Sequence, residues 1–206
     1  MKLTVHMCKN YGYTQVTTRC PHCGTLAVMS TILAQDVEIQ ASTICGQRKC
    51  PSCSGHLFFV KDSGQLVTYP PVKIAFDPIN IPTNVLKTFE EAISCHAGGM
   101  FIAAAIMVRR TLEDICANEN AQGNDLKQRI ADFGSKITLP KALLEAMNEL
   151  RILGNDAAHI EAKEYNNISD NEVKMAIRFT KEILKALYQY KELLSDLRDL
   201  KNKTEA

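Results

Sequence analysis

Residues 19–25 read "RCPHCGT", and the same pattern recurs in "KCPSCSG" at residues 49–55. Each copy is a C-P-x-C turn with a glycine soon after its second cysteine. Such a turn points two thiolates at one centre, so two turns supply the four sulfur ligands of a tetrahedral site that suits Zn2+. Two such turns joined by strand-forming sequence are typical of a zinc ribbon. The predicted metal ligands are Cys20, Cys23, Cys50 and Cys53.

Four protein ligands leave no open coordination position, so the predicted Zn2+ is structural. It would stabilise a small β module that cannot build a sufficient core of its own. Cys8 and Cys45 lie near the two turns in the sequence, and whether either replaces a ligand stays open at this point.

A redox role is the rival interpretation, because "CPHC" is also the active-site sequence of strongly oxidising thioredoxin-fold proteins. That role requires a βαβ unit and an oxidising compartment, and it does not explain the second C-P-x-C turn. The N-terminal "MKLTVHMCKNYG" lacks the apolar run of a signal peptide, and "GGMFIAAAIMV" at 98–108 is too short to cross a bilayer. We therefore expect a cytoplasmic protein with no membrane partner and with reduced cysteines.

Composition and charge exclude little. The 206 residues are 46% apolar and 23% charged, which is ordinary for a soluble globular protein. A net charge of +1 by itself indicates neither a nucleic acid nor a membrane as partner. The first 75 residues carry seven of the basic residues but three of the acidic ones, so that part presents a mildly basic surface able to contact phosphates.

The chain changes its pattern near residue 70. Residues 1–70 contain short runs such as "HLFFV" and "QLVTYP" around the hairpin signal "KDSGQ", which predicts antiparallel strands. Residues 71–82 are rich in proline and form a linker. Residues 83–206 carry apolar residues at helical spacing. We predict an α+β protein, with a zinc-ribbon β domain at 1–70 followed by a mainly α-helical bundle of four to five helices at 83–206.

Two helices of this bundle have distinct signals. "GGMFIAAAIMVRRTLEDICA" at 98–117 is apolar nearly all round, which predicts the central helix. The last helix opens with Ser169 and Glu172 at capping-box spacing and continues with apolar residues from Val173 to Leu187.

A polar row lies in "ELRILGNDAAHIE" at 149–161, where Arg151, Asn155 and His159 follow one another at steps of four. If residues 139–162 form one helix, this row lies far from the apolar stripe, on a side that also carries Leu144 and Ile152. A face with polar groups among apolar ones suits a partner, such as the second copy of a two-fold dimer.

Two interpretations of the row stay open. Histidine exchanges protons near neutral pH, arginine holds phosphate and asparagine orients an oxygen, so the row would support RNA cleavage without a metal. Alternatively, Arg151 pairs with a neighbouring acid such as Glu149 or Glu161, and Gly154 permits a close helix crossing. "RRTLE" at 109–113 predicts an exposed i,i+4 ion pair that also adds positive charge near the row.

The order of these segments resembles the prokaryotic domain-of-unknown-function family 4145. The resemblance covers most of residues 69–190 and rests on "YPP", "FEEAISC", "AAAIMVRRTLEDIC", "LRILGNDAAH" and "ILKALY". It implies kinship with the wider HEPN group of helical bundles, which occur in toxins, phage defence and restriction-linked proteins.

Many HEPN proteins are dimeric ribonucleases in which an arginine and a later histidine act together. By that resemblance His159 is the acid–base group, Arg151 binds phosphate and Asn155 supports them. The gap from Arg151 to His159 is longer than in that pattern, so Asn155 with His159 is an alternative unit.

The leading hypothesis is a nucleic-acid-directed defence or toxin-type protein, a homodimer that acts as a metal-independent endoribonuclease. The alternative is a non-catalytic zinc-ribbon adaptor that binds RNA, DNA or a protein partner in a restriction-like or defence system.

Overall fold

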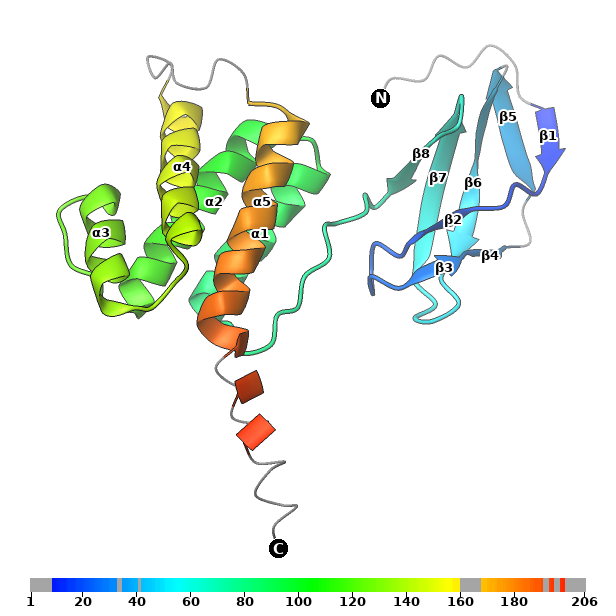
Figure 1. Ribbon diagram of the computed structural model, residues 1–206. Helices are drawn as coiled ribbons and strands as arrows, with labels where there is room; N and C mark the ends of the chain where they lie inside the picture. The colour runs from blue at the N-terminus through cyan, green and yellow to red at the C-terminus, as the bar shows by residue number, and fades with distance from the viewer. Residues whose placement is uncertain are drawn as a thin grey trace, which may run out of the picture. The chain divides into compact units, whose positions relative to one another are not determined.

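The computed structural model describes residues 9–32, 35–40, 42–159, 168–190, 193–194 and 197–198. The chain divides into two compact units, Met1–Ala75 and Phe76–Ala206, so the division falls inside the predicted linker. The described residues of the first unit form strands and those of the second form helices (Figure 1). The predicted α+β class is confirmed.

The first unit contains two antiparallel sheets. The larger sheet has the order β1-β5-β6-β7-β8, with β4 pairing to β6, and the smaller one is the β2–β3 hairpin. The strands are β1 Lys9–Gly12, β2 Thr17–Arg19, β3 Leu26–Val28, β4 Ser30–Thr31, β5 Asp36–Gln40, β6 Thr43–Lys49, β7 His56–Asp62 and β8 Gln65–Tyr69.

The predicted hairpin at "KDSGQ" joins β7 to β8. Asp62 pairs with Gln65, which leaves a two-residue turn. Both turn residues, Ser63 and Gly64, have positive φ, at 47° and 87°. Two-residue hairpins favour this conformation because its twist matches that of the flanking strands. The local turn signal is therefore confirmed.

A buried ion pair crosses the larger sheet from β6 to β5. The Arg48 guanidinium donates to both Asp36 carboxylate oxygens, at 2.7 and 2.6 Å, and both side chains are fully buried. Arg48 also donates to the carbonyls of Thr14 and Gln47, at 2.6 and 2.7 Å. Its guanidinium carbon lies 4.6 Å from the centre of the Phe59 ring. A buried charge needs this degree of pairing because desolvation is costly.

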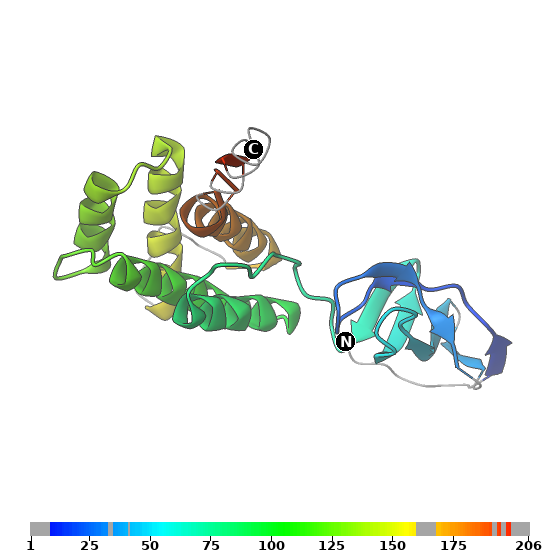
Figure 2. The same ribbon diagram turned by 90° about the horizontal axis from the view of Figure 1, so that it is seen from below.

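The second unit has two layers. The helices are α1 Thr83–Ala97, α2 Phe101–Asn118, α3 Leu126–Lys136, α4 Lys141–Ala158 and α5 Asp170–Leu184, with α5 continuing as a π-helical turn at Lys185–Gln189. In Figure 2, α1 and α2 form one layer, and α3, α4 and α5 lie side by side against it. The prediction of four to five helices is confirmed.

Helix α2 is the central element, as its all-round apolar sequence predicted, because it contacts each of the other four helices. Its fully buried residues include small side chains that let neighbouring helices approach closely. The fully buried residues of α2 are Ala104, Ala105, Val108, Thr111, Leu112, Ile115 and Cys116.

Helix α4 crosses α2 at Gly154. A Cβ at this position would overlap the Cβ of Arg109 and would lie 3.2 Å from the carbonyl oxygen of Ala105. Real Cβ atoms do not come as close to one another as this Cβ would come to that of Arg109, so the crossing requires glycine. The structural interpretation of Gly154 as a packing residue is confirmed.

Helix α5 begins with the predicted capping box. The backbone N–H of Ser169 donates to the Glu172 carboxylate at 2.9 Å, and the Ser169 hydroxyl also bonds to it. These bonds hold the pKa of Glu172 below its usual value. Val173, Ile177, Leu184 and Leu187 are buried, so the predicted apolar stripe packs on the bundle. Among the helices that the structure describes, none has the length and apolar character needed to cross a membrane.

The crossing at Gly154 makes a stability prediction. We expect Gly154→Ala to lower the free energy of unfolding by about 1–2 kcal/mol, because the overlap outweighs the helix propensity of alanine. Gly134→Ala in α3 is the matched control, since its Cβ would meet only the flexible end of Leu144, at 3.1 Å. Urea unfolding measures both variants, and an equal or higher stability for Gly154→Ala would contradict the close crossing.

Candidate functional site

The four predicted ligands converge. The sulfur atoms of Cys20, Cys23, Cys50 and Cys53 all lie within 4.8 Å of one another. The Cys20–Cys53 and Cys23–Cys50 sulfur pairs are each 3.7 Å apart. A tetrahedral thiolate site with metal–sulfur bonds of about 2.3 Å has sulfur–sulfur distances of about 3.8 Å. The sulfur spacing therefore fits a single tetrahedral metal ion.

The two cysteine turns have the same backbone geometry. In each turn the N–H of the first cysteine, Cys20 or Cys50, donates at 2.9 Å to the carbonyl five residues later. Its carbonyl accepts from the N–H four residues later, at 2.9 and 3.0 Å. That fourth residue has positive φ in both turns, 73° at Gly24 and 62° at Ser54. The repeated sequence thus encodes a repeated local structure.

Backbone N–H groups and one histidine ring surround the sulfurs. The N–H of His22 donates to the Cys20 sulfur, and that of Gly55 donates to the Cys53 sulfur, both at 3.4 Å. A Cβ at Gly55 would lie 2.5 Å from the His22 ring, so glycine makes room for it. The Nε2 of His22 is 2.7 Å from the His56 carbonyl oxygen. His22 therefore packs beside the cluster and is not one of the four converging ligands.

The thiols of the cluster and the groups around them shift one another's pKa values. The Thr25 hydroxyl lowers the pKa of Cys23 to about 6. The Gly55 N–H lowers the pKa of Cys53, but the Cys23 sulfur and burial together outweigh it and raise that pKa to about 12. Four negative charges within this distance repel strongly unless a cation lies among them. The cluster is thus chemically suited to exchange its protons for a metal ion.

The remaining cysteines are placed elsewhere or outside the description. Cys45 lies within β6, opposite Val37 and Val60, and does not join the cluster. Cys8 lies outside the described residues. Cys116 is fully buried, and burial raises its pKa to about 11, as expected of a core thiol. Cys20 and Cys23 lie in an antiparallel hairpin, so the βαβ context required by the redox interpretation is missing from this described region.

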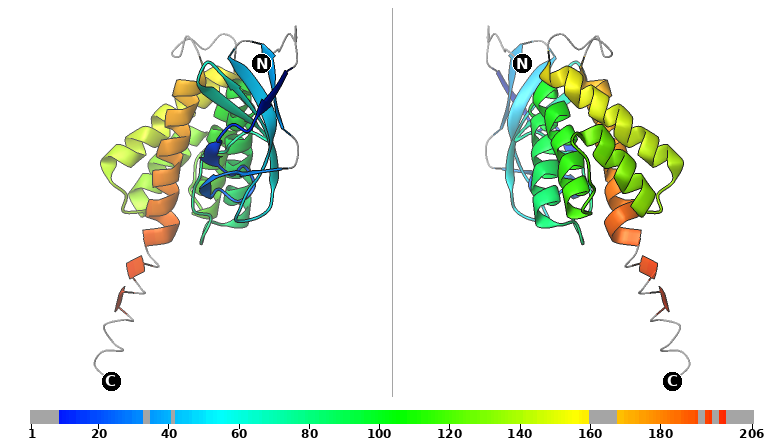
Figure 3. Two further views of the ribbon diagram at one scale, coloured as in Figure 1. Left: turned by 90° about the vertical axis from the view of Figure 1, so that its right-hand side faces the viewer. Right: turned by 90° about the vertical axis from the view of Figure 1, so that its left-hand side faces the viewer.

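A basic cavity of about 220 Å³ lies between α2, α3 and α4. The row residues Arg151 and Asn155 line it from α4. Further lining residues come from α2 and from the start of α3, namely Arg109, Asp125, Leu126 and Lys127. Helix α3 lies beside α4 in Figure 3, with Gly134 against Leu144. The prediction that the row faces away from its own fold is therefore wrong for Arg151 and Asn155, because residues of α2 and α3 line the same cavity, whereas the contact with a partner stays a prediction.

The cavity has an excess of positive charge. Three cationic side chains line it, against the single carboxylate of Asp125. That carboxylate accepts from the Gln128 N–H at 2.8 Å and caps α3. Arg109 makes the predicted ion pair with Glu113, at 3.3 Å. The buried Nε of Arg151 has no hydrogen-bond partner among the described residues. An anion would satisfy this donor and offset the charge.

His159 lies apart from the other two row residues. Helix α4 ends at Ala158, and His159 has an extended backbone, with φ −126° and ψ 120°. Its N–H donates to the Asn155 carbonyl at 3.0 Å and closes the last turn. The side chain is exposed and is not among those that line the cavity. The assumption of one helix through His159 is wrong. Glu161, one acid suggested for Arg151, lies outside the described residues.

The protein therefore combines a β unit that holds a paired-turn cysteine cluster with a helical unit that holds a basic cavity. The chain belongs to the family described as "Domain of unknown function (DUF4145)", whose model matches residues 90–203. This finding confirms the resemblance to family 4145, whereas kinship with the HEPN group stays a prediction. Neither the curated proteins nor the solved structures gave a match to the chain.

The sulfur geometry predicts one metal ion per chain. We expect Cys50→Ser to lose the metal and the structure of the β unit, because three thiolates cannot complete the tetrahedron. Cys45→Ser is the matched control and should retain the metal. Elemental analysis of the purified proteins measures the metal content per chain. Loss of the metal in the Cys45→Ser control would show that the ligand set is different.

Proposed function

We propose that this is a nucleic-acid-directed protein of the defence or toxin type whose helical unit binds and cleaves RNA without a catalytic metal. The observation that carries the proposal is the convergence of Arg109, Lys127, Arg151 and Asn155 on one cavity. Guanidinium and ammonium groups bind phosphate, and an asparagine amide orients a phosphate or sugar oxygen. The resemblance of the family to HEPN ribonucleases supports the choice of RNA.

His159 is the proposed acid–base group. His159 follows Asn155 by four residues and directly follows the last residue of α4. It therefore lies about 6 Å further along the helix axis, which is about one nucleotide along a bound strand. His159 would take the proton of a ribose 2′-hydroxyl, and the 2′-oxygen would form a bond to the adjacent phosphorus. The bond from phosphorus to the 5′-oxygen would break, and that oxygen would take a proton from water. The products are a 2′,3′-cyclic phosphate and a 5′-hydroxyl.

The arginines would act on the charge of the phosphate. Negative charge spreads over the phosphate oxygens as the 2′-oxygen attacks, and preorganised cations stabilise it most when water is excluded. Arg151 is suited to this role because its buried Nε lacks a partner among the described residues. Arg109 shares its charge with Glu113, so it contributes less.

The metal of the β unit is proposed to be structural Zn2+. Four thiolates with tetrahedral spacing suit Zn2+ and leave no position for a substrate. The ion would hold the two cysteine turns together and take no part in the cleavage.

A non-catalytic adaptor is the second candidate, and the position of His159 favours it. The cavity is lined by phosphate-binding groups, yet the histidine is not among them. In that case the helical unit binds a nucleic acid or an acidic partner protein of a restriction-like or defence system and leaves it intact.

An RNA cleavage assay tests the proposal. We expect the full-length protein to cut RNA in EDTA, with its zinc content verified afterwards. His159→Ala should reduce the rate by about 10²–10⁴-fold because a general base is lost. Arg151→Ala should reduce it by about 10²–10³-fold through lost charge stabilisation. End-group analysis should find a 2′,3′-cyclic phosphate.

Neighbouring arginines supply the control for this assay. Arg109 lines the cavity, whereas Arg110 on the same helix is 61% exposed and pairs with Glu113 and Asp114. RNA binding should weaken in Arg109→Ala and stay unchanged in Arg110→Ala. Full cleavage by His159→Ala would reject the catalytic role, and RNA binding without cleavage in the unmodified protein would favour the adaptor.

A further inference from the structure

A second hollow lies on the other side of α4, between α4 and α5. It has a volume of about 740 Å³. Its floor is apolar, formed by Ala146, Leu150, Leu153 and Ala176, which are buried. Met175 and Phe179 stand beside this floor and are 48% and 40% exposed. Large apolar side chains at the edge of an apolar hollow are typical of interaction surfaces.

The two helices that border this groove carry opposite charge on their outer edges. On α4 the edge bears the carboxylates Glu145, Glu149 and Asp156, of which the first two line the groove. One lysine, Lys141, lies at its start and pairs with Glu145 at 3.6 Å. At about 100° per residue, these positions fall within one narrow arc of the helix.

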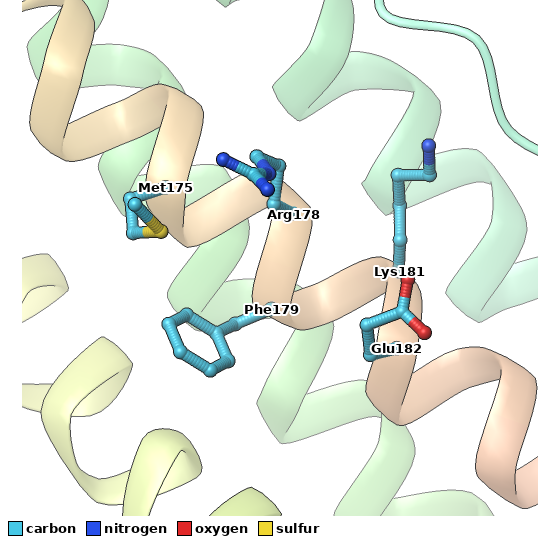
Figure 4. A pocket seen from close by; sticks show the side chains of 5 residues that line it. All are labelled: Met175, Arg178, Phe179, Lys181 and Glu182. Carbon is cyan, nitrogen blue, oxygen red and sulfur yellow. The ribbon is translucent and has the colours of Figure 1, made fainter.

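The α5 edge is basic. Lys174, Arg178 and Lys181 follow one another at helical spacing on the side of α5 away from α4. Figure 4 shows Lys181 leaving α5 on the side opposite to Met175 and Phe179. Burial lowers the pKa of Lys181, and the nearby charges of Lys185 and Arg178 lower it further, as expected where cations crowd together. Two acids lie near this edge, and each has a basic partner: Glu182 pairs with Lys185 at 3.1 Å, and Asp170 pairs with His96 at 2.8 Å.

We propose that this face binds a second copy of the chain, with Phe179 and Met175 of each copy seated in the groove of the other. The face is self-complementary because it holds both the projecting apolar side chains and the groove that accepts them. A two-fold dimer requires that property of its interface.

The charges select one orientation of the two-fold axis. An axis that runs along the groove places α4 of each copy against α5 of the other, so that each acidic edge meets a basic edge. An axis across the groove places α4 against α4 and brings like charges together, which is unfavourable. The first arrangement therefore pairs opposite charges along both sides of an apolar centre.

This interface differs from the one that the sequence suggested. Arg151 and Asn155 lie on the side of α4 that faces α2 and α3, whereas the groove lies on the side that faces α5. Each copy of the dimer would keep its own basic cavity, so the inference does not depend on the proposed function.

The mass of the full-length protein in solution, measured by light scattering after gel filtration, gives the first test. We expect a dimer, and we expect Phe179→Glu to reduce the mass to that of a monomer. Ile102→Glu on α2 is the matched control, because Ile102 is 59% exposed and lies outside the groove. A monomeric parent protein, or a dimer that survives Phe179→Glu, would overturn the proposal.

Charge reversal gives a sharper test of the orientation. One variant carries Glu145→Lys and Glu149→Lys, and the other carries Arg178→Glu and Lys181→Glu. Each alone should be monomeric, because both of its facing edges have the same sign. A mixture of the two should form a heterodimer in which both edge pairs are complementary again.

The mixing experiment distinguishes binding of a second copy of the chain from binding of a different partner in the groove. If the variants fold, as helical circular dichroism reports, and yet do not associate on mixing, then α4 does not face α5 of a second copy. That result, which would fit a groove that binds a different partner, would overturn the proposal.

Discussion

The sulfur cluster is the constraint on which the first unit depends. The turn of Cys20 and Cys23 joins β2 to β3, whereas that of Cys50 and Cys53 joins β6 to β7 in the other sheet. The two hairpins belong to sheets that share no strand, so their association relies on a small core, on these four sulfurs and on the contact between the His22 ring and the His56 carbonyl. Since a core of this size stabilises a fold only weakly, a metal ion bound by the four thiolates would provide much of the missing free energy.

The sequence predicted features that are encoded locally. The cysteine turns, the "KDSGQ" hairpin and the Ser169–Glu172 capping box each depend on residues within about five positions of one another. The Asp36–Arg48 pair was missed because its partners lie on different strands and meet only after β5 and β6 align. The one sequence feature that reflects this pair is Gly46 of β6, since a Cβ at that position would overlap the Asp36 carboxylate.

The candidate site was predicted in part for the same reason. Helical spacing placed Arg151 and Asn155 on one side of α4, and both line the cavity. Spacing within one helix does not reveal which other helix covers that side, so the contributions of Lys127 and Asp125 from α3 were missed. The sequence also did not predict the end of α4, because neither glycine nor proline follows Ala158 directly. The position of His159 therefore had to come from the structure.

Three different sides of helix α4 have different roles. Gly154 fixes the crossing with α2, Arg151 and Asn155 line the basic cavity, and Leu150 lies in the groove beside α5. Because α2 holds α4 by a crossing that tolerates no side chain, the cavity and the groove are both positioned by one rigid contact. Binding of a phosphate on one side does not require a partner on the other. Association through α5 would therefore bring two complete cavities into one particle, and would not build a shared one from two halves.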